Sequence, residues 1–432
     1  MCYPSTRYCT IDCLTICRID LKMFILPHSC SGWRPCHLTV RDDAGSLLGC
    51  CPLYIKSHSY GEFVFDQQWA AVCEQHLGVA YYPKLLVAVP FSPCPGPRLL
   101  VHAKLDDEGR AAMIKLMGRA LASISGQSGL SSVHINFNCK SEWAALKSVG
   151  YLQRSGLQFH WDNMDASGSN KYKSFDDFLM SLKQQRRKSI RQERKSIAKQ
   201  GLVVKRLTGD QISPELWRLF YEFYLNTIDR HYSQAYLTEE FFTMLGERMG
   251  DRVLLVIAER EPSPVTDPSL PPSPSSSASH VVAAALNLIG SDCLYGRNWG
   301  CIANGEDEFK NLHFELCYYQ ALEFAIERGL SRVEAGAQGP HKLQRGYMPS
   351  LTHSSHFIHS PTLRSLVERS VEAEGRRVLM EVQALSLEAS PYQAEGSRTR
   401  LMKRLEEHFQ VVQSSEAAGV CVTPTPSNYQ AS

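Results

Sequence analysis

The feature that most constrains this chain is an alternation of short apolar runs with runs of helical spacing, present in both halves. Short apolar runs between turn residues predict strands, and apolar residues every three to four positions predict helices packed on a sheet. In the first half, strand patterns lie at 36–41, 47–55, 82–90, 133–137 and 156–161, with helical patterns at 67–76, 107–125 and 142–147. In the second half, strand patterns lie at 202–207, 252–259, 281–289, 292–299, 333–335 and 353–359, with helical patterns from 174, after Ser213, over 308–328 and over 362–374. This order predicts an α/β protein with mixed sheets in two domains, 33–168 and 172–385.

Three segments differ in composition from the two predicted domains. Thirteen of the eighteen residues at 262–279 are proline or serine, which predicts a disordered insertion looped out of a hairpin. Residues 1–32 form a cysteine-rich segment, and residues 386–432 form a polar tail that we expect to be weakly structured.

The charge balance, the apolar runs and the cysteine spacing argue against several classes of protein. The 46 lysines and arginines nearly balance 44 aspartates and glutamates, so a general DNA or membrane binder is not expected. No apolar run near the N-terminus is long enough to span a bilayer, so we expect a soluble cytoplasmic protein, with an organellar transit peptide as the alternative. Eight of the 15 cysteines precede residue 52, but there is no CxxC pair, so we expect reduced thiols and no metal site.

The most basic segment, residues 183–199, carries eight lysines and arginines against the single Glu193. One interpretation is a solvated helix face, which is common for charge runs. The other is a binding site for an anion such as RNA phosphate, with Arg186, Arg187 and Arg191 as the contacts.

The loop at 333–349 concentrates glycine and polar residues. Its glycines are Gly336, Gly339 and Gly346, and the side chains that could surround a ligand are Gln338, His341, Lys342, Arg345 and Tyr347. We expect His341, Lys342 and Arg345 to contact an anionic or carbonyl group of a substrate, and Gln338 and Tyr347 to orient it. Glu334, at the end of the preceding strand, is a candidate general base, and His341 is a second catalytic candidate. A purely structural glycine turn is the alternative.

Several stretches together resemble the FemAB-like family of peptidoglycan biosynthesis or recognition proteins, which is of GNAT type. The resembling stretches are PLYIKSHSYGEFVFD (52–66), YYPKLLVAVPFSPCPGPRLL (81–100), RRKSIRQERKSIAKQG (186–201), LYGRNWG (294–300), NLHFELCYYQALEFAIERGL (311–330) and VEAGAQGPHKLQRGYMP (333–349). The resemblance implies two tandem GNAT-like N-acyltransferase domains. It also implies substrate contacts from Lys56, His58 and Arg297, which lie in the matching stretches. The family has a glutamate where this chain has Pro340, and residues 1–32 do not match its usual start.

The resemblance and the loop together predict an N-acyltransferase that moves an acyl or aminoacyl group to a small-molecule or peptide amine. Acyl-CoA or aminoacyl-tRNA is the expected donor, and no tightly bound cofactor is expected. The turn at 303–309 carries three acidic residues, which disfavours a phosphate cradle there and makes tRNA a competitor of CoA. The alternative function is a tandem GNAT-like binding module that recognises a glycan, peptide or RNA without turnover.

Overall fold

The computed structural model describes residues 32–403 and 405, apart from 231–233, 262–279, 304–307 and 337–338. The Pro/Ser insertion and nearly all of the cysteine-rich N-terminal segment therefore lie outside the described residues. The first-half strands are β1 (Trp33–Pro35), β2 (Leu38–Arg41), β3 (Leu47–Cys51), β4 (Leu53–Lys56), β5 (Lys84–Val87), β6 (Leu100–Val101), β7 (Ser132–Ile135) and β8 (Leu152–Asp162). The second-half strands are β9 (Leu202–Leu207), β10 (Val253–Arg260), β11 (Val281–Ile289), β12 (Cys293–Cys301), β13 (Arg332–Glu334) and β14 (Met348–Ile358).

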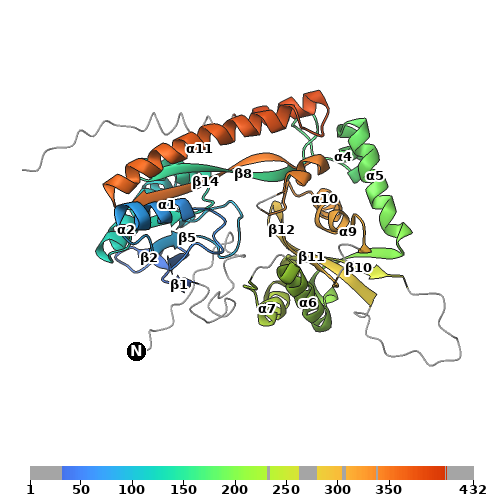
Figure 1. Ribbon diagram of the computed structural model, residues 1–432, viewed down its shortest axis with the longest axis horizontal. Helices are drawn as coiled ribbons and strands as arrows, with labels where there is room; N and C mark the ends of the chain where they lie inside the picture. The colour runs from blue at the N-terminus through green and yellow to red at the C-terminus, as the bar shows by residue number, and fades with distance from the viewer. Residues whose placement is uncertain are drawn as a thin grey trace, which may run out of the picture.

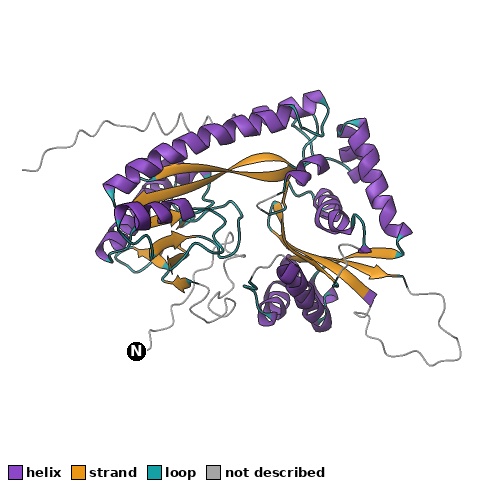
Figure 2. Ribbon diagram, viewed as in Figure 1, coloured by secondary structure: helices purple, strands orange, loops and turns teal. Residues whose placement is uncertain are grey.

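Helices cover the strands on both sides (Figure 2). Those of the first half are α1 (Gln67–Val72) with its π-helical extension η3 (Cys73–Leu77), α2 (Asp107–Gln127) and α3 (Lys140–Lys147). Those of the second half are α4 (Phe175–Ser181), α5 (Gln184–Lys199), η4 (Gly209–Gln211), α6 (Pro214–Arg230), α7 (Glu239–Met249), η5 (Gly250–Arg252), α9 (Leu312–Phe314), the π-helical turn η7 (Glu315–Tyr319), α10 (Gln320–Glu327), η8 (Pro340–Arg345) and α11 (Pro361–Leu387). Within the described ranges, none of the helices combines the length and apolarity that a membrane span requires.

An eleven-stranded mixed sheet runs through the described parts of both halves (Figure 1). Its strand order is β1-β4-β5-β7-β14-β8-β13-β12-β11-β10-β9, and β2-β3-β6 form a smaller sheet. The two sides of the β14–β8 pair resemble each other, with four strands beyond β14 and five beyond β8. On one side β7 is parallel to β5 with α2 between them in sequence, and on the other β13 is parallel to β12 with α9, η7 and α10 between them. The expected α/β class with mixed sheets is confirmed.

The position of β14 corrects the expectation that the strand pattern at 353–359 and the helix after it complete the second domain. β14 lies between β7 and β8, antiparallel to both, and α11 lies along β8 and β14 (Figure 1). Phe357 pairs with Val133, and Leu351 pairs with Leu157. Apolar patterning identifies a strand and its buried face but does not identify its partner. The domain boundary near 165–174 stays a prediction.

Several predicted starts and ends of strands and helices can be compared with the structure. β2 and β3 form the expected antiparallel hairpin, but the apolar run at 47–55 divides at Pro52, and β4 joins the large sheet. Ser213 accepts a hydrogen bond from the backbone of Leu216 at 3.3 Å, and Pro214 begins α6. The helix expected from 174 is broken at Leu182, whose extended backbone separates α4 from α5.

The expectation of a weakly structured tail from residue 386 is wrong as far as residue 403. α11 continues to Leu387, and residues 394–403 are helical. Tyr392 is fully buried and donates to the carbonyl oxygen of Gly346 at 2.7 Å. The buried Arg400 lies 3.8 Å from the centre of the Tyr392 ring and donates to the Tyr172 hydroxyl at 2.6 Å. The polar composition of the tail does not reveal this packing, because arginine is seldom buried unless other groups pair with it, and here the partners of Arg400 include residues of a distant segment.

Alternate side chains of the second-half strands point into two separate cores. Leu254 and Val256 belong to the core under α4, α5, η7 and α10, whereas Leu255 and Ile257 belong to the core under α6 and α7. Val333 points into the first of these cores. Its neighbour Glu334 therefore points to the opposite face of the sheet.

Candidate active site

The parallel pair β12–β13 is joined over a short length and then diverges. The three pairs of its ladder are Cys293 with Arg332, Leu294 with Val333, and Tyr295 with Glu334. The next residue of β12 is Gly296, where a Cβ atom would lie 3.3 Å from the carbonyl oxygen of Glu334. Glycine therefore permits the close approach of the two backbones at the point where they separate.

β12 carries a β-bulge directly after this point. Its pairing with β11 passes from Gly296 to Trp299 over one residue of β11, so Arg297 and Asn298 stand opposite a single residue. Such a bulge leaves one residue outside the ladder and re-aims its backbone. The Arg297 side chain donates a hydrogen bond to the carbonyl oxygen of Phe91. This bond holds the first-half loop that contains Phe91 beside the bulge.

Glu334 is a buried acid at the last position of the parallel ladder. Its side chain is 7% exposed, and among the described residues its Oε2 atom has no hydrogen-bond partner. Its Oε1 atom lies 4.0 Å from Nδ1 of His160, on the adjacent strand. Burial raises the pKa of Glu334 to about 7, although Arg332 and Arg98 act to lower it. At neutral pH the carboxyl group can therefore both accept and release a proton.

Glu334 lines a pocket of about 580 Å³ on its face of the sheet. Other lining residues are Asp162, Lys171, Cys293, Tyr295 and Arg332. The pocket thus extends along the β12–β13 ladder from its first pair to its last. A volume of this size is in the range that small-molecule sites occupy.

The loop after β13 packs against the crossover helix. The buried Lys342 donates to the carbonyl oxygen of Gly336 at 3.0 Å, and the Arg345 guanidinium lies 3.3 Å from the centre of the Phe314 ring. Nε2 of the exposed His341 is hydrogen-bonded to the Tyr318 hydroxyl at 2.8 Å. Arg345 and His341 therefore lie against α9 and η7, whereas Lys342 is bonded within the loop.

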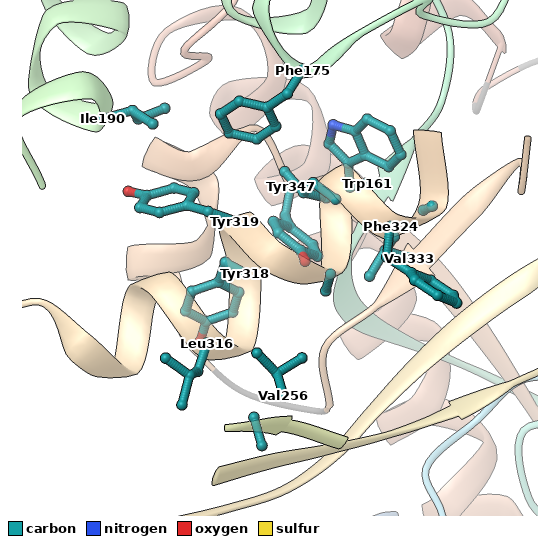
Figure 3. Close-up of a cluster of buried hydrophobic side chains, with 14 of the residues drawn as sticks. Trp161, Phe175, Ile190, Val256, Leu316, Tyr318, Tyr319, Phe324, Val333 and Tyr347 are labelled. Carbon is teal, nitrogen blue, oxygen red and sulfur yellow. The ribbon is translucent and has the colours of Figure 1, made fainter. Parts of the chain in front are cut away.

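Burial shifts the pKa values of two side chains in this loop. Burial lowers the pKa of Lys342 to about 8, opposed by Cys317, and burial with the charges of Lys342 and Arg345 lowers the pKa of His341. Tyr347 is fully buried in the aromatic cluster of Figure 3, with its ring centre 5.5 Å from that of Tyr318. It points into the core that contains Val333, on the face opposite Glu334. Gln338 and the side chain of Pro340 lie outside what the structure describes.

The basic helix α5 is built against this loop. Glu193 accepts hydrogen bonds from the Tyr319 hydroxyl and, at 3.1 Å, from Arg345. Arg186 donates to Gln344 at 2.7 Å, Arg187 donates to Met180, and Arg191 forms an ion pair with Asp176. Arg186 and Arg187 are half-buried, whereas the lysines exposed on this helix are Lys188, Lys195 and Lys199. One side of α5 is thus occupied by the protein itself, and these lysines face solvent.

Lys56 and His58 lie in the first half, at and after the end of β4. Lys56 is fully buried, donates to the carbonyl oxygen of Tyr60 at 3.1 Å and lies 4.1 Å from the centre of the Trp33 ring. Burial lowers its pKa. His58 is half-buried and accepts a hydrogen bond from the backbone of Tyr60 at 3.2 Å.

Sequence reasoning missed a buried charged cluster beside Lys56. Lys84 is fully buried and donates to Ser59 at 2.8 Å, to Glu62 at 3.0 Å and to Asp66, which also accepts from Tyr81 at 2.7 Å. Burying such charges is costly unless they are paired. The only signal in the sequence was that Glu62, Asp66 and Lys84 lie close to apolar strand patterns.

Comparisons with known proteins found one family match and several solved structures of low sequence identity. A family described as FemAB-like, peptidoglycan biosynthesis/recognition, matches residues 27–270 and 273–394. No curated protein matches the sequence. The crystal structure of FemX aligns at 12% identity with a TM-score of 0.46, covering 78% of this chain and 91% of FemX. A tandem GNAT protein from the clavulanic acid pathway aligns at 10% identity with a TM-score of 0.35, covering 76% and 84%.

The family match extends over both halves and includes the β12–β13 pair, the loop after it and the buried Lys84 cluster. The chain therefore belongs to the FemAB-like family.

Proposed function

We propose that the chain transfers an acyl or aminoacyl group from an activated donor to an amine, with Glu334 as the general base. The amine nitrogen attacks the carbonyl carbon of a thioester or ester. A C–N bond forms, and the C–S or C–O bond to the donor breaks. Glu334 accepts the proton that the amine loses, and solvent protonates the departing thiolate or ribose oxygen.

The observation that carries this proposal is the setting of Glu334. Its Oε2 atom, which has no hydrogen-bond partner among the described residues, its burial and its pKa of about 7 suit a group that takes up a proton near neutral pH. It lies on the pocket and at the last pair before β12 and β13 separate. His341 is a weaker candidate, because its Nε2 atom is already hydrogen-bonded to Tyr318.

The donor carbonyl would lie where the strands part, beside the bulge at Arg297 and Asn298. A backbone N–H that has left the ladder is a fixed donor for the negative charge that develops on the carbonyl oxygen. Acyl-CoA and aminoacyl-tRNA both supply a suitable carbonyl. The exposed lysines of α5 support a donor rich in phosphate, and their number favours aminoacyl-tRNA.

The test compares Glu334→Gln with Glu372→Gln, which replaces an exposed glutamate of α11. The proteins are incubated with acetyl-CoA, a longer acyl-CoA or aminoacyl-tRNA and a mixture of amines, and release of thiol or free tRNA is measured. Glu334→Gln should lower kcat by about 10²–10⁴-fold, the usual contribution of a general base, and the control should match the parent. Activity of the parent should fall about tenfold per pH unit below pH 7.

Two other results have clear meanings. Stabilisation by a donor, a glycan or RNA without any transfer would support the binding-module alternative. Transfer that survives Glu334→Gln unchanged would remove Glu334 from the reaction.

A further inference from the structure

The pocket at Glu334 is walled by segments that are distant in sequence. Besides the starts of β12 and β13, residues of the 162–171 connection and Lys403 of the tail line it. The packed tail therefore completes the pocket, held by the contacts of Tyr392 and Arg400.

Cations gather at the exposed part of this pocket. Lys403 is exposed, and its Nζ atom lies 3.4 Å from the thioether sulfur of Met164, which is a weak acceptor. Lys171 is 48% exposed at its side chain, and its Nζ atom donates to the carbonyl oxygen of Gly329 at 2.6 Å. It also lies 4.0 Å from Asp292, a 69% exposed acid that lines the same pocket and is too far away for a hydrogen bond. Arg332 is 40% exposed and forms an ion pair with Asp162 at 3.2 Å. The hydrogen-bond acceptors of Lys171 and Lys403, a carbonyl oxygen and a thioether sulfur, are uncharged, and each ammonium group has further N–H donors for a ligand.

The two parts of the pocket have opposite character. Glu334 is 7% exposed, and one of its carboxylate oxygens has no partner in the part of the chain that the structure describes, whereas Lys171 and Lys403 are exposed to solvent. An ammonium group would satisfy the buried carboxylate, and an anionic group would satisfy the lysines. An amine without an anionic group would make no ion pair with these lysines.

We propose that this pocket binds the acceptor as a zwitterion, with its amine at Glu334 and a carboxylate or phosphate at Lys171 and Lys403. The inference rests on the proposed function, since it assigns the acceptor for the same base. It identifies the acceptor class as small amino-acid-like or aminophosphate compounds and gives the C-terminal tail a role in selecting them.

The test measures binding by calorimetry in the absence of any donor, so that it does not depend on turnover. The zwitterionic probes are glycylglycine and 2-aminoethyl phosphate, and the single-charge probes are ethylamine and N-acetylglycine. The parent should bind one of the zwitterions at least about tenfold more tightly than either single-charge probe, the scale expected for a hydrogen bond between charged groups. The preferred zwitterion distinguishes a carboxylate from a phosphate.

The double variant Lys171→Ala, Lys403→Ala should lose at least about tenfold in affinity for that zwitterion and little for ethylamine. A matched double variant, Lys104→Ala, Lys147→Ala, changes two exposed lysines of the first half and should bind like the parent. In the transfer assay the pocket variant should raise KM for the amine with kcat unchanged, unlike Glu334→Gln.

Three outcomes would overturn the inference. They are equal binding of ethylamine and the zwitterions, unchanged zwitterion affinity in the pocket double variant, and no binding of any probe by the parent at millimolar concentration. If transfer still depends on Glu334 in any of these cases, the proposed function stands and only the acceptor assignment falls.

Discussion

Replacing Glu334 by glutamine is expected to change how the stability of the protein depends on pH. Burial raises the pKa of Glu334 from 4.5 to about 7, so the folded protein holds this proton more tightly than the unfolded chain does. As pH rises from 4.5 to 7 the folded state therefore loses stability, and above pH 7 the loss is complete. One pKa unit corresponds to about 1.4 kcal/mol, and 7 minus 4.5 is 2.5, so the full cost is about 3 kcal/mol.

Glutamine cannot ionise, so the variant avoids this cost. From the same two pKa values, the parent loses about 1 kcal/mol at pH 5 and about 3 kcal/mol at pH 8. The free energy of unfolding of Glu334→Gln, minus that of the parent, should therefore increase by about 2–3 kcal/mol between these pH values. An unpaired amide nitrogen in the variant would lower its free energy of unfolding by the same amount at every pH. The change of the difference with pH is therefore the quantity that tests the pKa of Glu334.

The assay is urea unfolding followed by tryptophan fluorescence at several pH values from 5 to 8. Other titrating groups, including the Lys84 cluster, cancel when the variant is compared with the parent. Glu372→Gln, at an exposed position, should show a difference that is flat with pH. A flat difference for Glu334→Gln would refute the buried, proton-holding state of Glu334 and weaken its assignment as a base.

Three substitutions test the packing around the loop and tail by thermal unfolding. Gly346→Val should lower the free energy of unfolding by more than about 1 kcal/mol, because Gly346 has a φ of +93° and an added Cβ would lie 2.7 Å from a phenylalanine ring. Gly45→Val is the control, since Gly45 has a φ of +83° but open space around an added Cβ. An equal loss in both variants would show that backbone strain alone, and not the contact with the ring, destabilises Gly346→Val. Arg345→Ala should cost about 1–3 kcal/mol, since it removes a charged partner of Glu193, and an unchanged melting temperature would count against this ion pair. Arg400→Ala should cost a similar amount and make the tail more sensitive to protease; unchanged protection would show that Arg400 does not hold the tail.

Local patterns predicted the elements and some special positions of this chain. The spacing of apolar residues predicted most strands and helices, and the strand end at Glu334 indicated an acid with a chemical role that stays a prediction. These patterns could not predict which distant strands pair, because the apolar spacing of β14 does not identify β7 and β8 as its neighbours. Burial of charge was also missed. Lys84 and Arg400 are long charged side chains that sequence reasoning assigns to the surface, and their buried partners come from other segments.

The position of β14 between β7 and β8 affects how the chain can fold while it is being synthesised. Ser355 pairs with Ile135, and 355 minus 135 is 220, so the ribosome must add 220 residues after β7 before its partner exists. At about 5–20 residues per second this takes roughly 10–40 s. During that time β7 and β8 each have an edge that lacks its neighbour, and such edges pair readily with other chains. We therefore expect the nascent first half to be prone to pairing with other chains until β14 has been synthesised.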